Sequence, residues 1–179
     1  MIYFTSDLHF CHNKEFLYKS RGFNSVYDMN LQIVKNWNSL IDYNDDIYIL
    51  GDIMLNDDSE GISLLHKLNG RIHIILGNHD TDNRIPLYNN SYNVCSIEYG
   101  SRMRYKGYSF VLSHYPCICT YVQDKALKAA YISLHGHTHS KDIFEFKDFY
   151  AYNVAVDAHD CTPVSIDQII EDLHKHYDR

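Results

Sequence analysis

The sequence lacks any apolar run long enough to cross a bilayer, so we expect a protein that does not span a membrane. Its first residues, MIYFTSD, lack the basic segment, apolar stretch and small-residue cleavage site of a secretory signal, which predicts a cytoplasmic location. Internal repeats, low-complexity segments and linkers are also missing. A chain of 179 residues with these properties predicts a single domain over residues 1–179.

Cysteine pairs are lacking too. The cysteines are odd in number and show no CxxC spacing, which argues against a disulfide framework or a zinc ribbon. We therefore expect reduced thiols, mostly buried, at all five positions: Cys11, Cys95, Cys117, Cys119 and Cys161.

Positive charge is scarce, because 16 Lys and Arg stand against 23 Asp and Glu, for a formal net charge of −7. This balance argues against duplex nucleic acid as a partner, since duplex binding needs a basic face. A phosphate ligand would need positive charge supplied locally. Divalent cations can supply it, and the 12 histidines and many aspartates are suitable ligands.

Five short apolar runs each end in side chains that can bind a metal. The runs are MIYFTSD, DIYILGD, RIHIILGNHD, YSFVLSHYP and AAYISLHGHTH. Nearly continuous apolar runs bounded by Gly, Asp or Asn are typical of strands buried on both faces of a covered sheet. The polar residues are therefore expected at strand ends.

Helical periodicity separates these strands. Residues 26–41 repeat apolar side chains at three- and four-residue steps after Ser25, which predicts an amphipathic helix with a capping-box start. A second helix is expected at 59–68, and a C-terminal helix is expected after Ser165.

The segments between and after these helices predict further strands. Lys106 and Gly107 divide residues 101–112 into two strand-like pieces, which predicts a hairpin, and residues 145–157 add late strands. The alternation of strands and helices predicts an α/β layered sheet, with a ligand crevice at the carboxyl ends of the strands.

The candidate metal ligands are the donor side chains at these strand ends. Each motif alone has an ordinary explanation as a turn, a core histidine or a solvated loop. Donors that converge on one sheet edge are what a multinuclear site requires, and seven suffice for two ions if one carboxylate bridges. Mixed imidazole and carboxylate ligation without thiolate favours Mn, Fe, Zn or Ni over Ca. The seven are Asp7, His9, Asp52, Asn78, His114, His137 and His139.

The segment LHGHTHS places three histidines at every second position. On an extended loop, His137 and His139 would project to the same side, because side chains alternate with period two. We therefore expect these two imidazoles to serve neighbouring ions.

The blocks SDLH, GD, GNHD, SHYP and GHTH, in this order between Asp7 and His139, resemble the five signature blocks of the calcineurin-like metallophosphoesterase superfamily. The resemblance implies a four-layer α/β/β/α sandwich, in which two mixed sheets are flanked by helices, rather than one doubly wound sheet. It also implies a dinuclear metal-dependent phosphoesterase, with Mn as the first expected metal. The start SDLHFCH is similar to a group of small bacterial and phage members that begin SDxHFxH.

The resemblance also implies residue roles. A hydroxide activated by two ions would attack phosphorus, and His79 would protonate the departing oxygen, a task suited to an unperturbed pKa of about 6.5. His135 matches no ligand and is expected to be structural. The first ion would be held by Asp7, His9 and His139, the second by Asn78, His114 and His137, with Asp52 as the bridge.

The sequence departs from the protein serine/threonine phosphatases of this superfamily, because the GD block continues as GDIMLNDD instead of an Asp-Arg-Gly element. Phosphoprotein substrates are therefore disfavoured, and the orienting partner of His79 is left open. Asp80 is a candidate, although bracing its loop is the favoured role. His12 is a candidate phosphate contact or a structural residue, and Arg84 is a candidate phosphate contact or, preferably, an exposed loop cation.

The expected substrate is a small phosphomonoester, phosphodiester or nucleotide. A cyclic-nucleotide or other small phosphodiesterase is the nearest alternative. A non-catalytic scaffold is the alternative of another class, because a retromer subunit with this fold acts in protein assembly. That alternative predicts eroded ligands, whereas all seven ligands and His79 are present. A metallo-β-lactamase-like hydrolase needs HxHxDH, which HGHTHSKD does not supply.

Overall fold

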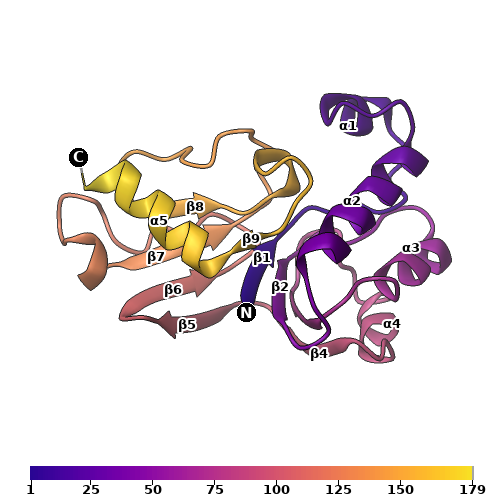
Figure 1. Cartoon of the computed structure of the whole chain (residues 1–179), viewed down its shortest axis with the longest axis horizontal. Helices are drawn as coiled ribbons and strands as arrows, with labels where there is room; N and C mark the ends of the chain where they lie inside the picture. Colours follow the sequence, from indigo (N-terminus) through magenta and orange to yellow (C-terminus); the bar gives the residue numbers. More distant parts are fainter. Residues whose placement is uncertain (179) are drawn as a thin grey trace.

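The computed structural model describes residues 1–178 as two mixed β-sheets flanked by helices (Figure 1). The first sheet has the order β4 (Val94–Glu98), β3 (Arg71–Ile75), β2 (Asp46–Leu50), β1 (Ile2–Thr5) and β9 (Val164–Ser165). The second has the order β5 (Ser101–Tyr105), β6 (Tyr108–Leu112), β7 (Tyr131–His135) and β8 (Ala151–Asn153). Two sheets confirm the architecture that the family resemblance implied and exclude the single doubly wound sheet.

Parallel pairing dominates both sheets and brings strand ends together. In the first sheet β1 to β4 are parallel and only β9 runs antiparallel to β1. In the second sheet β6, β7 and β8 are parallel, and β5 is antiparallel to β6. The carboxyl ends of parallel neighbours lie at one edge, so residues that follow these strands can meet there.

The helices are α1 (Glu15–Ser20), α2 (Val26–Leu40), α3 (Asp58–Leu65), α4 (Ile85–Asn89) and α5 (Ile166–Tyr177), with 3₁₀ turns η1 (Leu127–Ala129) and η2 (Val156–Ala158). Helix α2 confirms the first predicted helix, because the Ser25 hydroxyl accepts a hydrogen bond from the Asp28 amide at 3.1 Å. Helix α5 confirms the C-terminal one, because the Ser165 hydroxyl caps it in the same way. Short α1, α4, β4 and β9 were not predicted.

The second predicted helix is wrong in its bounds, because α3 begins one residue earlier and ends at Leu65 instead of Leu68. The side chain of Asp57 caps its start by accepting from the Glu60 amide. After Leu65 the amide of Leu68 bonds to the carbonyl three residues before it, so the chain tightens into a 3₁₀-type turn. Leu68 is buried from that turn.

The predicted hairpin is confirmed by β5 and β6. Lys106 and Gly107 form its two-residue turn with φ of 47° and 88°. Positive φ at both central residues is the geometry that matches the twist of paired strands. Late strands are confirmed only in part, because residues 145–157 contain the short strand β8 alone.

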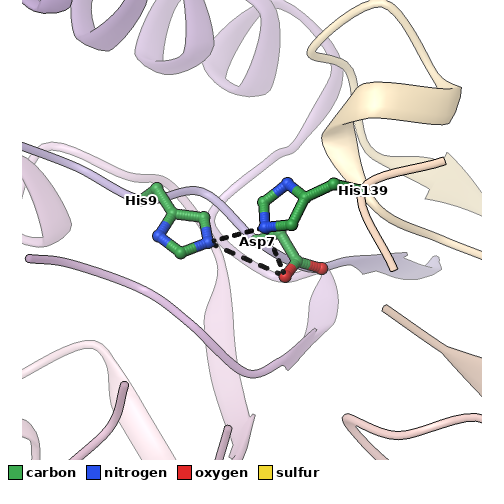
Figure 2. Close-up of side chains that lie close together, drawn as sticks. All are labelled: Asp7, His9 and His139. Atoms are coloured by element: carbon green, nitrogen blue, oxygen red, sulfur yellow. Dashed lines mark hydrogen bonds and ion pairs between the residues drawn. The ribbon is translucent and has the colours of Figure 1, made fainter. Parts of the chain in front are cut away.

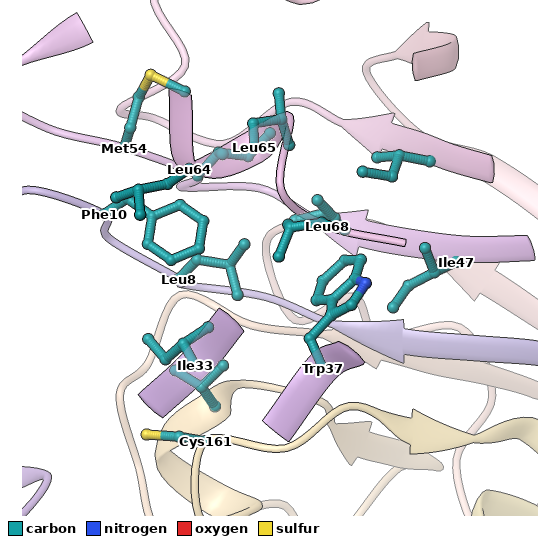
Figure 3. Close-up of a cluster of buried hydrophobic side chains, with 14 of the residues drawn as sticks. Leu8, Phe10, Ile33, Trp37, Ile47, Met54, Leu64, Leu65, Leu68 and Cys161 are labelled. Atoms are coloured by element: carbon teal, nitrogen blue, oxygen red, sulfur yellow. The ribbon is translucent and has the colours of Figure 1, made fainter. Parts of the chain in front are cut away.

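Two apolar cores lie on either side of the first sheet. One core packs α2 and α3 against β1, β2 and β3, and Figure 3 shows Trp37 of α2 beside Leu68 and Ile47. The other joins the first sheet to the second and to α5, through residues such as Phe4, Phe110 and Ile169. Each fully buried side chain of this size stabilises the fold by about 1.5–3 kcal/mol. Helices α2 to α4 therefore gather on one side of the first sheet and α5 on the other (Figure 1).

Two sequence-based expectations concern the chain as a whole. No helix within residues 1–178 is both long and apolar enough to cross a membrane. The cysteines are all free thiols, as expected, but only Cys11 and Cys161 are buried, and Cys95 is exposed, so the prediction of mostly buried thiols is wrong. Extension of a single domain over residues 1–179 stays a prediction.

Candidate metal centre

The predicted donors follow five different strands and converge at the edge where the sheets meet. Asp7 and His9 follow β1, Asp52 follows β2, Asn78 and His79 follow β3, His114 follows β6, and His137 and His139 follow β7. Backbone hydrogen bonds join these loops, because the amide of His9 donates to Asp52 at 3.0 Å and that of Gly136 donates to His114 at 3.0 Å. The edge is therefore a continuous network of strand-end loops.

Five of the seven donors have left-handed backbone conformations: Asp7 (φ 57°), His9 (50°), Asp52 (57°), His137 (70°) and His139 (52°). Such conformations cost about 1–3 kcal/mol each and persist where surrounding structure enforces them. They also correct one prediction. The loop after β7 is not extended, and positive φ at alternate residues, rather than strand alternation, directs His137 and His139 towards the centre.

Asp7, His9 and His139 form the first donor group. Figure 2 shows both imidazoles directed at the same oxygen of Asp7. The Nε2 atoms of His9 and His139 lie 3.8 and 3.7 Å from Oδ1 of Asp7 and 3.1 Å from each other. Donor atoms of all three lie within 4.8 Å of one another, which leaves a position between them suited to one cation.

The Asp7 carboxylate shows why a cation belongs in this position. Its side chain is fully buried, and burial raises its pKa despite opposing interactions with His114 and His139. Its Oδ2 accepts from the Ser6 hydroxyl at 2.6 Å and from the His137 amide at 3.0 Å. Its Oδ1 has no hydrogen-bond partner among residues 1–178. A buried acceptor of this kind is costly unless an ion or donor satisfies it.

The second donor group contains Asn78, His114 and His137. Nδ1 of His114 donates to the carbonyl of Leu50 at 2.8 Å, so its Nε2 presents a lone pair. That Nε2 lies 2.9 Å from the Asn78 side-chain oxygen and 3.2 Å from Nδ1 of His137. Two acceptors, Nε2 of His114 and the Asn78 oxygen, therefore face each other, and a cation bound to both would remove their repulsion.

Asp52 lies between the two groups. Its Oδ2 is 3.6 Å from Nε2 of His9, and its Oδ1 is 3.5 Å from Nε2 of His114. Asp7 also lies centrally, because one of its carboxylate oxygens lies within 4.8 Å of ligand atoms of both Asp52 and His114. The arrangement agrees with a bridging carboxylate.

Two ligand histidines, His9 and His137, are in a form suited to metal binding, whereas the hydrogen bond to Asp157 outweighs burial and raises the pKa of His139. Burial, together with repulsion by neighbouring His139 and Arg21, lowers the pKa of His9 far below its ordinary value. Burial and repulsion by His114 also lower the pKa of His137. Both rings are therefore neutral at neutral pH, and the neutral imidazole is the metal ligand.

Gly136 is required for close packing beside the first group. A Cβ at this position would lie 2.2 Å from Oδ2 of Asp7 and 2.1 Å from Oγ of Ser6. Gly136→Ala is therefore expected to displace the Asp7 carboxylate and to lower the free energy of unfolding by about 1–3 kcal/mol. Urea denaturation and the Mn²⁺ content after dialysis measure the two effects. Gly100→Ala is the control, because its Cβ would make only a 3.4 Å contact; equal behaviour of the two variants would contradict the packing argument.

His79 lies at the open side of the site. Its side chain is 40% exposed, its amide donates to Oδ1 of Asp52 at 2.9 Å, and its Nε2 lies 3.8 Å from Oδ2 of the same carboxylate. Asp80 does not contact the His79 ring. It accepts from the amides of Asp52 and Gly77 and from the hydroxyl of Tyr88, at 2.8, 2.9 and 2.8 Å. These contacts brace the loops after β2 and β3.

Three further residues singled out in the sequence, His12, Arg84 and His135, lie at different places relative to the metal centre. His12 lies at the site, with its ring centroid 5.3 Å from that of His9. Arg84 is directed elsewhere: its side chain is only 11% exposed, it donates to Asp58 at 2.7 Å, and it binds the His79 carbonyl. The alternative of an exposed loop cation is therefore wrong, and the phosphate contact stays a prediction. His135 is buried beside Phe146, and burial lowers its pKa to about 4.

Sequence reasoning missed two charged residues behind the first group. Asp157 accepts from Nδ1 of His139 at 3.0 Å and pairs with Arg21 at 2.8 Å. A signal for Asp157 was present, because the run YAYNVAVD ends in Asp, as do the runs MIYFTSD, DIYILGD and RIHIILGNHD. No local pattern marks Arg21, which lies just after α1.

The sequence matches the model of the calcineurin-like phosphoesterase superfamily domain over residues 1–154. The chain belongs to this superfamily. Membership in a metallophosphoesterase family implies divalent metal ions, and two clusters of side chains could hold such ions: Asp7, His9 and His139, and Asp7, Asp52 and His114.

Several proteins are similar to this calcineurin-like phosphoesterase over almost its whole length. An uncharacterized protein from Methanocaldococcus jannaschii is 32% identical, over 97% of this chain and 92% of the relative. The gene 66 protein of Mycobacterium phage D29 is 28% identical, over 97% and 98% of the two chains. A crystal structure of a protein of unknown function from Aquifex aeolicus is similar in fold, with a TM-score of 0.72 and 24% identity over 96% of this chain and 98% of that one.

Proposed function

We propose that this calcineurin-like phosphoesterase hydrolyses a small phosphate ester with two divalent ions, and that Mn²⁺ is the preferred metal. The observation that carries the proposal is the fully buried Asp7 carboxylate, whose unpaired oxygen faces the ring nitrogens of His9 and His139. Asp7, His9 and His139 would hold the first ion, Asn78, His114 and His137 the second, and Asp52 both. Bound there, the ions would lower the pKa of a shared water and offset charge on the phosphoryl oxygens.

The residues of the chain then have separate tasks. His79 lies on the exposed side of Asp52, where its ring can give a proton to the departing oxygen. Its backbone is fixed by the Asp52 carboxylate through the amide and by Arg84 through the carbonyl. Two divalent ions outweigh the charges of Asp7 and Asp52, so the centre attracts phosphate although the whole chain carries −7.

A cavity of about 310 Å³ lies beside His79 and provides the place for the leaving group. Its walls include His12, His79 and the α1 side chains Phe16 and Leu17, and the Phe16 side chain is 72% exposed. The part of the wall formed by Phe16 and Leu17 is apolar, so it favours a leaving group with an uncharged planar part, such as a nucleoside or an aryl group.

Phe16→Ala is expected to raise KM for a nucleoside or aryl ester by about 2–10-fold, because a ring contact contributes about 0.5–1.5 kcal/mol. Activity on a methyl ester should stay unchanged, since the methyl group does not reach the ring. Steady-state kinetics on both esters make the test. Tyr43→Ala, which removes an exposed aromatic ring from another part of the surface, is the matched control. An equal change of KM on both esters would exclude contact with the leaving group.

Metal analysis of the purified protein, coupled to a hydrolysis screen with added Mn²⁺, tests the proposed function. The screen contains phosphomonoesters, phosphodiesters and cyclic nucleotides, which separates the phosphatase from the phosphodiesterase alternatives. We expect two ions per chain and hydrolysis of at least one class. Bound metal without any hydrolysis would instead support the metal-binding scaffold, and absence of metal binding would overturn the site assignment.

A further inference from the structure

A buried ion pair lies directly behind the first donor group. Nε and Nη2 of Arg21 donate to the two carboxylate oxygens of Asp157 at 2.9 and 2.8 Å, and the side chains are 1% and 5% exposed. We propose that Asp157, held by Arg21, is a positioning residue that makes the first ion site stronger than the second. This inference rests on the proposed dinuclear function.

The contact between Asp157 and His139 fixes the imidazole for metal binding. A carboxylate only accepts hydrogen bonds, so Nδ1 of His139 must donate to Oδ2 of Asp157 across their 3.0 Å separation. In the neutral ring, Nε2 then carries a lone pair that faces His9 and Asp7. A carboxylate behind a ligating histidine fixes its ring orientation and raises its basicity towards a metal.

The Arg21 guanidinium connects this carboxylate to the loop that carries Asp7. Nη2 also donates to the carbonyl of Asp7 at 2.8 Å, and Nη1 donates to that of Leu8 at 3.3 Å. Arg21 therefore holds the Asp157 carboxylate and the backbone of Asp7 in fixed positions relative to each other, which aligns two ligands of the first site, Asp7 and His139.

Within residues 1–178, no carboxylate accepts a hydrogen bond from an imidazole of the second donor group in the way that Asp157 does from His139. Nδ1 of His114 donates to the neutral carbonyl of Leu50, and Asn78 contributes an amide oxygen in place of a carboxylate. Neutral partners polarise an imidazole less than a carboxylate does. The two sites are therefore unequal, and the first should fill at the lower metal concentration.

Asp157→Asn is the test of this inequality, because asparagine keeps the shape and an acceptor oxygen but removes the charge. We expect Mn²⁺ to bind the first site about 10–100-fold more weakly, while the second site keeps its affinity. Isothermal titration with Mn²⁺ alone gives both affinities. Electron paramagnetic resonance separates isolated Mn²⁺ from coupled pairs, so neither measurement depends on turnover.

The control for loss of a structural carboxylate is Asp172→Asn. Asp172 accepts from the Tyr152 hydroxyl at 2.8 Å in the second core, away from the strand-end loops. This variant should keep both Mn²⁺ affinities. Equal weakening of both sites in Asp157→Asn, or first-site weakening of the same size in the control, would overturn the inference and leave the proposed function intact. Failure of the parent protein to bind Mn²⁺ would overturn both.

A second measurement needs neither metal nor a fully stable variant. Nitrogen-15 shifts of the metal-free parent, recorded at a pH at which the His139 ring is neutral, should show its proton on Nδ1 and none on Nε2. Arg21→Lys retains a cation but loses the bidentate contact with Asp157. In this variant the proton of His139 should therefore be less strictly confined to Nδ1, although Asp157 is still present. A parent ring that carries its proton on Nε2 would contradict the proposed orientation, even if Asp157→Asn does not fold.

Discussion

His79→Ala is expected to lower kcat by about 10²–10⁴-fold on phosphate esters with alkoxide leaving groups. The His79 ring is 40% exposed and lies 3.8 Å from Oδ2 of Asp52, on the side of the leaving-group cavity. An alkoxide is a poor leaving group and needs a proton as its bond to phosphorus breaks. Removal of the ring takes that proton away but leaves all seven metal ligands in place.

The measurement compares an alkyl ester with a nitrophenyl ester of the same phosphate. Nitrophenolate leaves without protonation, so the loss on that substrate should be much smaller. His66→Ala is a matched control, because His66 bonds to the Ser91 hydroxyl in another part of the molecule. Equal losses of kcat on both esters in His79→Ala would exclude the acid role and indicate a role in binding or metal retention.

Asp52→Asn is expected to lower kcat by about 10³-fold or more, because the metal centre contributes several kcal/mol to transition-state stabilisation. The carboxylate lies within 3.6 Å of the Nε2 atoms of both His9 and His114, and it also accepts from the His79 amide. Loss of its charge weakens both ion sites and loosens the loop that carries the general acid. The amide keeps the shape, so the fold should persist.

Metal content and kcat of the Asp52→Asn protein are the two measurements. Asp46→Asn is the control, because Asp46 stands at the opposite end of β2, where it binds Arg71 at 2.7 Å. That variant should keep both ions and its activity. Retention of two ions with a nearly unchanged kcat in Asp52→Asn would contradict the bridging assignment.

The strand-end motifs could be predicted because their information is local. Each apolar run and the donor after it lie within about ten residues, and burial periodicity identifies strands over such lengths. The capping residues Ser25 and Ser165 were predictable for the same reason, since each bonds to an amide three residues ahead. The short elements α1, α4, β4 and β9 were not, because segments this short carry too little periodicity.

Parts of the site depended on contacts that no local pattern contains. Arg21 and Asp157 are separated by 136 residues, and their pairing exists only because the segment after α1 and the segment after β8 meet behind the first donor group. The sequence also could not show that Arg84 is largely buried, because its guanidinium pairs with Asp58, which lies 26 residues earlier in the chain.

The sequence by itself determined the donor chemistry: which residues could bind metal, their order along the chain, and their place after buried strands. Only the tertiary structure decided how these donors face one another, through left-handed conformations at Asp7, Asp52 and His139, and which charges stand behind them. The reason is physical. Hydrophobic periodicity specifies each strand from its neighbours in sequence, whereas the orientation of a side chain in a shared site is set by the packing of two sheets and by backbone strain that only the complete fold can maintain.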